Sequence, residues 1–345
     1  MADDRLGSPP VFGVCGYSGS GKTTLIEGLI PRLIADGLAV AVVKHDAHGL
    51  TVDTAGKDTD RLFRAGATVF AHDPAQSFLR RAPRGGEALS TAVDLLLRDH
   101  DVVLVEGHKQ TPLSAKLWLQ RQAGDEAPPE ARPVVASLGP DVDRLEIAYH
   151  LLASWLREQM RRAPLRAGVL IGGRSSRMGR PKQTLTVGDT TWAERVAAAL
   201  QPHVSELCLL GDGEVPAPLA GLPRLADVPH RSGPQAGMLA AMRWDPAAAW
   251  IFAACDMPLL SAEAIAWLLD QCAPGTWAIL PRRADTGQIE PLCAWYDPRA
   301  AAILETLDRP IALANHRKTH TPAVPPSLEA AWCNMNTPAD CEGLA

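Results

Sequence analysis

The stretch VFGVCGYSGSGKTTLIEGLI, residues 11–30, decides the fold of the first half of this 345-residue chain. Val11–Cys15 is a short apolar run typical of a buried strand, and the apolar residues of Thr23–Ile34 recur at helical spacing. Between them, Gly16–Thr23 matches G-x-x-x-x-G-K-[ST], a loop whose backbone N–H groups surround phosphate oxygens. A strand, this loop and a helix in that order predict a P-loop.

The residue types of this loop explain how it holds a nucleotide. Glycine lets the backbone curl so that successive N–H groups converge on an anion. Lys22 supplies a positive charge for the outer phosphates, Thr23 can offer its hydroxyl to Mg²⁺, and the following helix adds its N-terminal dipole. The candidate phosphate-binding residues are Gly19, Ser20, Gly21, Lys22, Thr23 and Thr24.

Charged side chains follow the next two apolar strands. Val102–Glu106 ends in a carboxylate that can hold the Mg²⁺ shell, so we expect Glu106 at the nucleotide as a metal ligand. Leu38–Lys44 ends at the same sheet edge, where a cluster of polar residues is favoured as a site but is also typical of solvated surface. The polar residues that follow this strand are His45, Asp46, Asp53 and 56–59.

Strands and helices alternate through the whole chain, which predicts the α/β class with mostly parallel sheets covered on both faces. In the first half, the further strands expected are Lys116–Leu119 and Val134–Ala136, and the helices are Ala88–Arg98 and Arg144–Met160. In the second half, strands are expected over 167–171, 206–210, 250–255, 277–280 and 292–296, and helices over 191–200, 237–243 and 262–272.

The length requires more than one domain. A single hydrophobic core stops growing by about 250–300 residues, and this chain has 345. Arg157–Arg166 carries four arginines and one proline between the end of a helix and a fresh strand at Ala167. We therefore expect domains over residues 10–160 and 167–345, joined by a linker at 161–166.

A second glycine-rich loop, LIGGRSSRMGRPK at residues 170–182, follows the first strand of the second half. It lacks G-K-[ST], so it is not a second P-loop. Small residues would let the backbone wrap a triphosphate, and Arg177 and Lys182 would neutralise its charge, which is most of the catalysis in phosphoryl and nucleotidyl transfer. Arg174 and Arg180 are read as part of a basic surface turn.

Two other features of the second half fit the same chemistry. Asp256 ends the apolar strand Trp250–Ala254, where a carboxylate can hold Mg²⁺ against a phosphate. Cys255 beside it is read as core, because no second Cys or His lies at metal spacing. Gly233–Gly237 opens a helix with a rigid turn that approaches a ligand or simply starts the helix.

The amino-acid composition narrows the range of possible binding partners. The net charge of −5 is spread almost evenly over the two halves, so a nucleic-acid-binding role loses support. The seven cysteines form no C-x-x-C pair, which argues against a zinc ribbon or a disulfide framework and fits a reducing cytoplasm. No apolar run reaches the ~18 residues of a membrane span and the acidic start is no signal peptide, so we expect a cytoplasmic protein without a membrane partner.

The first half resembles the molybdopterin-guanine dinucleotide biosynthesis adapter family over residues 10–160. The resemblance is carried by residues 15–24, by KHDAHGLTVDTAGKDTDRLFRAGA at 44–67, by VEGHK at 105–109 and by 114–121. It implies a P-loop NTPase-type three-layer domain that binds GTP and Mg²⁺ through the P-loop and Glu106, with weak GTPase activity. No second catalytic base is visible in the sequence.

The second half resembles the molybdenum cofactor guanylyltransferase family over residues 167–342. The motifs are L-x-G-G-x-S-x-R-M-G-x-x-K, G-P-x-x-G, C-D-x-P and N-M-N-T-P in order. The resemblance implies a Rossmann-like nucleotidyltransferase domain that joins the GMP part of GTP to molybdopterin or Mo-molybdopterin with Mg²⁺, releasing pyrophosphate. Proteins of molybdenum insertion and molybdoenzyme maturation are implied as further partners.

The same resemblance assigns roles to individual residues. Leu170, Ile171, Gly172 and Gly173 would line the nucleotide, Lys182 would contact its phosphates and Asp227 would hold GTP. Asp256 would bind GTP and Mg²⁺, and Asn334 and Asn336 would lie near the pterin substrate or the reacting phosphate. The expected catalytic residues are Lys182, Arg177 and Asp256. The phosphate of molybdopterin is already ionised near neutral pH, so no general base is required.

Two departures from the family pattern bear on these roles. Ile171 replaces a smaller residue, which we attribute to packing, and Leu209–Asp212 lacks an asparagine that holds the nucleotide, so that contact is lost or moved to Asp212.

Two alternative functions stay open. One is a cytidylyl- or sugar-phosphate nucleotidyltransferase fused to a P-loop GTPase, against which Gly172-Gly173 and Gly233–Gly237 argue. The other is a GTP-dependent adapter without transferase activity, against which Lys182 and Asp256 argue.

Overall fold

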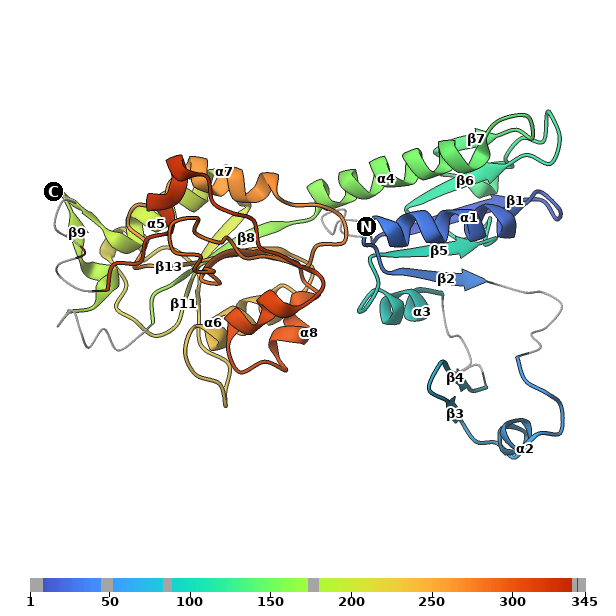
Figure 1. Ribbon diagram of the computed structural model, residues 1–345, viewed down its shortest axis with the longest axis horizontal. Coiled ribbons are helices and arrows are strands. Elements are labelled where there is room, and N and C mark those ends of the chain that lie inside the picture. Colours follow the sequence, from blue (N-terminus) through green and yellow to red (C-terminus); the bar gives the residue numbers. More distant parts are fainter. Residues whose placement is uncertain (1–8, 45–51, 83–88, 173–179, 337–339, 341–345) are drawn as a thin grey trace. The chain divides into compact units, whose positions relative to one another are not determined.

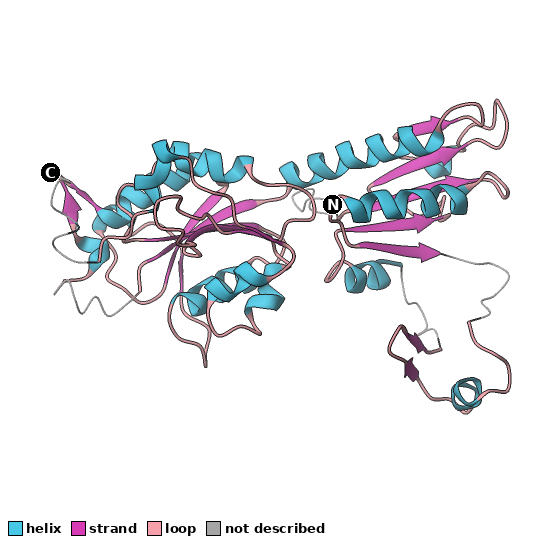
Figure 2. Cartoon of the chain, in the orientation of Figure 1, coloured by secondary structure: helices cyan, strands magenta, loops and turns pink. Residues whose placement is uncertain are grey.

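The computed structural model describes residues 9–44, 52–82, 89–172, 180–336 and 340. These residues divide into two compact units, Pro10–Leu152 and Ala153–Ala345, and each unit is a sheet with helices against it (Figure 2). The division falls within helix α4, Arg144–Arg162, rather than in a loop.

The first unit is built on a five-stranded sheet in which every neighbouring pair is parallel, in the order β2-β5-β1-β6-β7. The P-loop strand β1 therefore lies at the centre, beside the strand that ends in Glu106. The bounds are β1 Val11–Gly16, β2 Val40–Lys44, β5 Val102–Glu106, β6 Ala115–Leu119 and β7 Ala136–Leu138. Strand β7 begins two residues later than the sequence predicts.

Helices cover both faces of this sheet (Figure 1). Helix α3, Leu89–Leu96, packs Val93 against Val103 and Val105 on one face. Helix α1, Lys22–Ala35, buries Leu25, Ile26, Leu29 and Leu33 on the other, with α4 next to it: a Cβ at Gly28 would stand 2.9 Å from Leu145. The expectation of an α/β unit with a parallel sheet is confirmed, because the buried strands have apolar residues on both faces.

A short excursion between β2 and β5 contains helix α2, Asp58–Arg64, and an antiparallel hairpin of β3, Val69–His72, and β4, Ser77–Arg80. Asp60 organises it: its carboxylate accepts hydrogen bonds from the Gly56 N–H at 2.8 Å, Arg64 at 2.8 Å and Arg80 at 3.0 Å. These bonds, led by the one from Gly56, lower the pKa of Asp60 to about 2. The polar run 53–60 thus includes a structural ionic cluster.

The second unit is built on a seven-stranded mixed sheet in the order β12-β11-β8-β13-β15-β14-β16. Strands β12, β11, β8 and β13 are parallel, whereas β15 runs antiparallel to β13 and β14. The bounds are β8 Leu165–Leu170, β11 Glu206–Leu210, β12 Arg224–Leu225, β13 Ala249–Ala254, β14 Ala278–Ile279, β15 Cys293–Tyr296 and β16 Thr319–His320. A small hairpin pairs β9 Thr186–Val187 with β10 Thr190–Thr191.

Two apolar clusters pack against opposite faces of this sheet. One holds Ile171 and Ile251 with helices α5, Trp192–Leu200, and α7, Ala262–Asp270; the other holds Leu210 and Phe252 with α6, Pro234–Trp244, and α8, Ala300–Leu304. Helix α5 begins at a capping box between Thr191 and Glu194. The 3-10 turns are Pro129–Ala131, Lys182–Thr184, Gln201–His203, Ala217–Leu219, Pro310–Asn315 and Pro326–Trp332.

No helix within the described ranges is both long and apolar enough to cross a membrane.

Candidate functional sites

The P-loop of the first unit connects β1 to α1 through a glycine-dependent turn. Gly19 and Gly21 have φ angles of 76° and 88°, a region that residues with a Cβ rarely adopt. The Ser20 side chain is buried under the loop, and a Cβ at Gly16 would stand 2.5 Å from its Oγ. The loop therefore keeps its curled backbone in this structure, as the motif predicts.

Three side chains of the predicted nucleotide site lie around this loop. The Lys22 amine donates to the carbonyl oxygens of Gly16 at 3.3 Å and Tyr17 at 2.9 Å. The Thr23 hydroxyl donates to the two oxygens of Glu106 at 3.0 and 3.1 Å. Glu106 reaches Thr23 because β5 lies directly beside β1. A hydroxyl beside a carboxylate is an oxygen donor set that suits Mg²⁺.

Lys44 also belongs to this group, because its amine lies 3.5 Å from the Glu106 carboxylate. His45 and Asp46 lie outside the described residues. Asp53 forms an ion pair of 3.3 Å with Arg80 in the α2–β4 excursion.

Arg144 supports the P-loop and was not identified from the sequence. At the start of α4, its guanidinium donates to the carbonyl oxygens of Ser20 at 2.9 Å, Gly139 at 2.7 Å and Gln120. One side chain thereby ties the loop to the segments that follow β6 and β7. The only sequence signal is an arginine at a helix start, which is too common to single out.

In the second unit, Lys182 lies between two predicted site residues. Its Nζ donates to Asp256 Oδ2 and to Asn336 Oδ1, both at 2.8 Å. The three residues come from the turn after the second glycine-rich loop, from the end of β13 and from the segment after the last 3-10 turn. Asp256 follows Lys182 by 74 positions in the sequence, and Asn336 follows it by 154. The fold therefore brings together residues that are far apart along the chain.

One carboxylate oxygen of Asp256 has no hydrogen-bond partner within the described part of the chain. Its Oδ1 is buried, and no hydrogen bond to it is found among the described residues. A buried carboxylate oxygen is costly to leave unpaired, so this atom is a candidate ligand for a cation. At Asp256 and throughout the described ranges, no group of three or more His, Cys, Asp and Glu side chains is arranged to hold a metal. Burial raises the pKa of Cys255 to about 12, as expected for a core thiol.

The expected nucleotide-lining residues that the structure describes lie at the end of β8 and just after β12. Leu170 and Ile171 are buried, and Ile171 packs in the core, which explains the larger residue there. Asp227 lies against α6, where a Cβ at Gly237 would be 3.3 Å from its Oδ1. Burial, together with the charge of Asp212, raises the pKa of Asp227. Gly173 and Arg177 lie outside the described residues.

The turn after β11 approaches the second glycine-rich loop so closely that a side chain is excluded. A Cβ at Gly213 would stand 1.8 Å from the Ile171 carbonyl oxygen. We predict that Gly213→Ala destabilises the second unit by about 1–3 kcal/mol, because backbone must move to relieve the overlap. Urea unfolding of the full chain measures this. Gly221→Ala is the matched control, since nothing lies within 4 Å of a Cβ there, and equal stability of the two variants would contradict the prediction.

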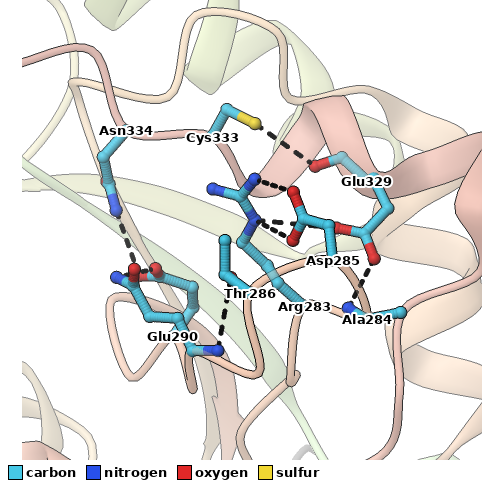
Figure 3. Close-up of polar contacts among 9 residues, drawn as sticks. Arg283, Ala284, Asp285, Thr286, Glu290, Glu329, Cys333 and Asn334 are labelled. Carbon is cyan, nitrogen blue, oxygen red and sulfur yellow. Dashed lines mark hydrogen bonds and ion pairs between the residues drawn. The ribbon is translucent and has the colours of Figure 1, made fainter.

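Beside Asn334 is a polar cluster that sequence reasoning missed (Figure 3). Asn334 Nδ2 donates to the buried carboxylate of Glu290 at 3.1 Å. Arg283 forms ion pairs with Asp285 at 2.5 Å and with Glu329 at 3.6 Å. Burial raises the pKa of Glu290, an effect that the hydrogen bond from Asn334 opposes. The feature that singles out this cluster is the burial of Glu290. Burial of a single glutamate cannot be read from the sequence.

The helix-opening turn at 233–237 has the rigid form that its glycine and proline predict. Gly233 has a φ of 73° and caps α6, and Pro234 is the first residue of that helix. Gln235 is buried and donates to the carbonyl oxygens of Leu304 and Leu307 at 2.5 and 2.9 Å. The hydrogen bonds of Gln235 thus hold the turn against α8 and the residues that follow α8.

Comparisons with known proteins agree with this division. The model of the family "Molybdopterin guanine dinucleotide synthesis protein B" matches residues 11–138, and that of the "MobA-like NTP transferase domain" matches residues 167–320. A molybdopterin-guanine dinucleotide biosynthesis adapter protein of Haemophilus influenzae is 36% identical over 162 residues, which are 43% of this chain and 89% of that protein.

Two further relatives extend the comparison. A probable molybdenum cofactor guanylyltransferase of Carboxydothermus hydrogenoformans is 31% identical over 193 residues, which are 52% of this chain and 94% of that protein. A molybdenum cofactor biosynthesis bifunctional protein of Synechocystis sp. is 30% identical over 139 residues, which are 40% of each chain.

Proposed function

The chain belongs to the molybdopterin-guanine dinucleotide biosynthesis adapter family in its first half and to the molybdenum cofactor guanylyltransferases in its second, and we propose that the second unit transfers GMP from GTP to molybdopterin or Mo-molybdopterin. It is a bifunctional molybdenum cofactor biosynthesis protein with nucleotidyltransferase activity. The observation that carries the proposed site is the Lys182 amine, held between Asp256 and Asn336.

Lys182 would stabilise the charge that develops during transfer. In the proposed reaction, a phosphate oxygen of molybdopterin attacks the α-phosphorus of GTP, and the bond to the departing pyrophosphate breaks. Negative charge grows on the phosphate oxygens, and a positioned ammonium group lowers the energy of that state. The ion pair with Asp256 and the bond to Asn336 hold the amine in place before substrate binds.

Asp256 is the proposed metal ligand, with Mg²⁺ as the cation. Its buried Oδ1 has no hydrogen-bond partner among the residues described, and a hard carboxylate oxygen fits that ion. A bound divalent cation supplies Lewis-acid stabilisation of the reacting phosphates. Asp256 itself keeps Lys182 oriented through its other oxygen, Oδ2.

The nucleotide is proposed to lie along Leu170–Gly173 and Asp227, with Arg177 as a further cation. The described part of this set supports the proposal through the close packing of Gly172 on the turn after β11 and through the position of the Asp227 carboxylate against α6. Asn334 and Asn336 are proposed to face the pterin substrate. The attacking phosphate is already ionised near neutral pH, so these residues need not remove a proton.

The first unit is proposed to bind GTP through Gly19, Ser20, Gly21, Lys22, Thr23 and Thr24. The bond between Thr23 and Glu106 supports a Mg²⁺ site there. We propose weak GTP hydrolysis and a role in assisting or delivering to the transferase unit, with proteins of molybdenum insertion and molybdoenzyme maturation as further partners.

We predict that the purified chain, incubated with molybdopterin, Mg²⁺ and one nucleotide, forms a dinucleotide with GTP and little with CTP or ATP. Mass spectrometry of the product measures the choice directly. Preferential use of CTP would assign a cytidylyltransferase instead. Absence of product with every nucleotide, from a chain that still binds GTP, would assign an adapter without transferase activity.

A further inference from the structure

Glu290 lies where three chain segments of the second unit meet. Its N–H donates to the Pro281 carbonyl oxygen at 2.9 Å. Two residues later, the Leu292 carbonyl accepts from Ala254 N–H at 2.7 Å, next to Asp256. The Asp256 carbonyl in turn accepts from Met335 N–H at 2.8 Å, between the two site asparagines. Backbone hydrogen bonds thus fix Glu290 relative to the proposed reaction site.

Both carboxylate oxygens of Glu290 accept hydrogen bonds although the residue is only 3% exposed. Gln288 Nε2 donates to Oε1 at 2.5 Å, and Asn334 Nδ2 donates to Oε2 at 3.1 Å. A buried carboxylate is expensive to retain unless its bonds serve a purpose, and a glutamine would fill the same volume without a charge. In Figure 3 the Asn334 amide nitrogen points at Glu290.

We propose that Glu290 is a positioning residue for the pterin substrate: it fixes the amide of Asn334 so that Oδ1 faces the N–H donors of the pterin ring. The inference rests on the proposed function, since it assumes that the second unit binds molybdopterin. It assigns to Glu290 no contact with substrate.

The hydrogen-bonding capacity of each group fixes the orientation of the Asn334 amide. A carboxylate only accepts, so Glu290 selects the orientation in which Asn334 presents its nitrogen to the carboxylate and its oxygen elsewhere. The Asn334 side chain is half-buried, and no partner of its Oδ1 is found within the described ranges.

The side-chain amide of Asn336 is held in the opposite orientation to that of Asn334. The Lys182 ammonium only donates, so Asn336 Oδ1 must face it and the amide nitrogen remains as the donor. Residues 334 and 336 therefore offer an acceptor and a donor from one segment. The amide edge of a pterin carries a ring N–H beside a carbonyl oxygen, which is the complementary pair. A triphosphate offers only hydrogen-bond acceptors, so it cannot donate a hydrogen bond to Asn334 Oδ1.

The test is a double-mutant cycle on the full chain with purified GTP and molybdopterin. We expect Glu290→Gln to raise the KM for molybdopterin about tenfold, as for loss of one well-placed hydrogen bond, while the KM for GTP and kcat change less than about twofold. Asn334→Ala should raise the same KM at least as much. In the Asn334→Ala background, Glu290→Gln should add nothing, because Glu290 acts through that amide.

Asn334→Asp is a second test of whether the amide of Asn334 positions molybdopterin. It places two carboxylates together and removes the donated hydrogen bond, so it should also raise the KM for molybdopterin selectively. Glu305→Gln, an exposed carboxylate that pairs with Arg243, is the matched control and should leave all constants unchanged. Thermal melting of each variant separates loss of folding from loss of binding.

Three results would overturn the inference. They are an unchanged KM for molybdopterin in folded Glu290→Gln, an equal rise in both KM values, and additive effects in the double variant. If the wild-type chain itself forms no dinucleotide, the proposed function fails instead. Activity of the wild-type chain therefore distinguishes the two failures.

Discussion

Asp256→Asn is expected to lower kcat for GMP transfer at least about a thousandfold, the upper range for removing one group that stabilises transition-state charge. A factor of a thousand corresponds to about 4 kcal/mol of transition-state stabilisation. The variant removes the charge that holds Lys182 and a carboxylate whose buried Oδ1 has no hydrogen-bond partner among the described residues. Asparagine keeps the volume, so the fold should survive. Initial rates at saturating GTP and molybdopterin, with product quantified by mass, measure the effect.

Asp245→Asn is the matched control for this experiment. Asp245 also forms an ion pair in the second unit, at 2.5 Å from Arg166, but belongs to no part of the proposed site. It should retain wild-type kcat within about twofold, because its partner Arg166 is not a residue of the proposed site. Retention of more than a tenth of the wild-type rate by Asp256→Asn would contradict the role assigned to Asp256.

The P-loop site was predictable because its chemistry is contiguous in the chain. The motif places Lys22 and Thr23 by itself, and Glu106 follows from a strand that ends in a carboxylate next to β1. The second site was predictable only in its parts. Lys182, Asp256 and Asn336 stand in separate motifs, and their mutual hydrogen bonds depend on the sheet that brings them together.

Residues that act through long-range contacts could not be predicted. Arg144 bonds to the Ser20 carbonyl across 124 positions, and Glu290 bonds to Asn334 across 44. Neither belongs to a motif, and each is recognisable only by where its side chain is buried or directed. A lone arginine or glutamate is most often a surface residue, so composition gives no reason to select it.

The fold shows the same division between local and non-local information. Periodicity predicts that β15 is a strand, but its antiparallel direction is set by the chain path that precedes it. The hairpin of β3 and β4 escaped prediction because its strands are short and largely exposed, without a buried face to impose alternation. Strand β8 was clear because it is apolar and central.

Lys22→Ala is expected to weaken GTP binding by the first unit about ten- to a hundredfold while leaving GMP transfer within about twofold of wild type. Hydrogen bonds from an ammonium to phosphate oxygens contribute about 1.5–3 kcal/mol, and the alanine removes them all. In the structure the Lys22 amine is already held at the mouth of the loop by the Gly16 and Tyr17 carbonyls. Calorimetric titration of the full chain with GTP should show one class of site weakened.

Arg98→Ala, which removes an exposed positive charge of the first unit outside the P-loop, is the control and should leave GTP binding unchanged. The transferase assay decides whether the two sites work independently, because Lys182 and Asp256 belong to the second unit and Lys22 to the first. With purified GTP and molybdopterin, we expect the reaction to need only the second unit. Complete loss of GMP transfer in Lys22→Ala would therefore show that the first unit's nucleotide controls the chemistry of the second.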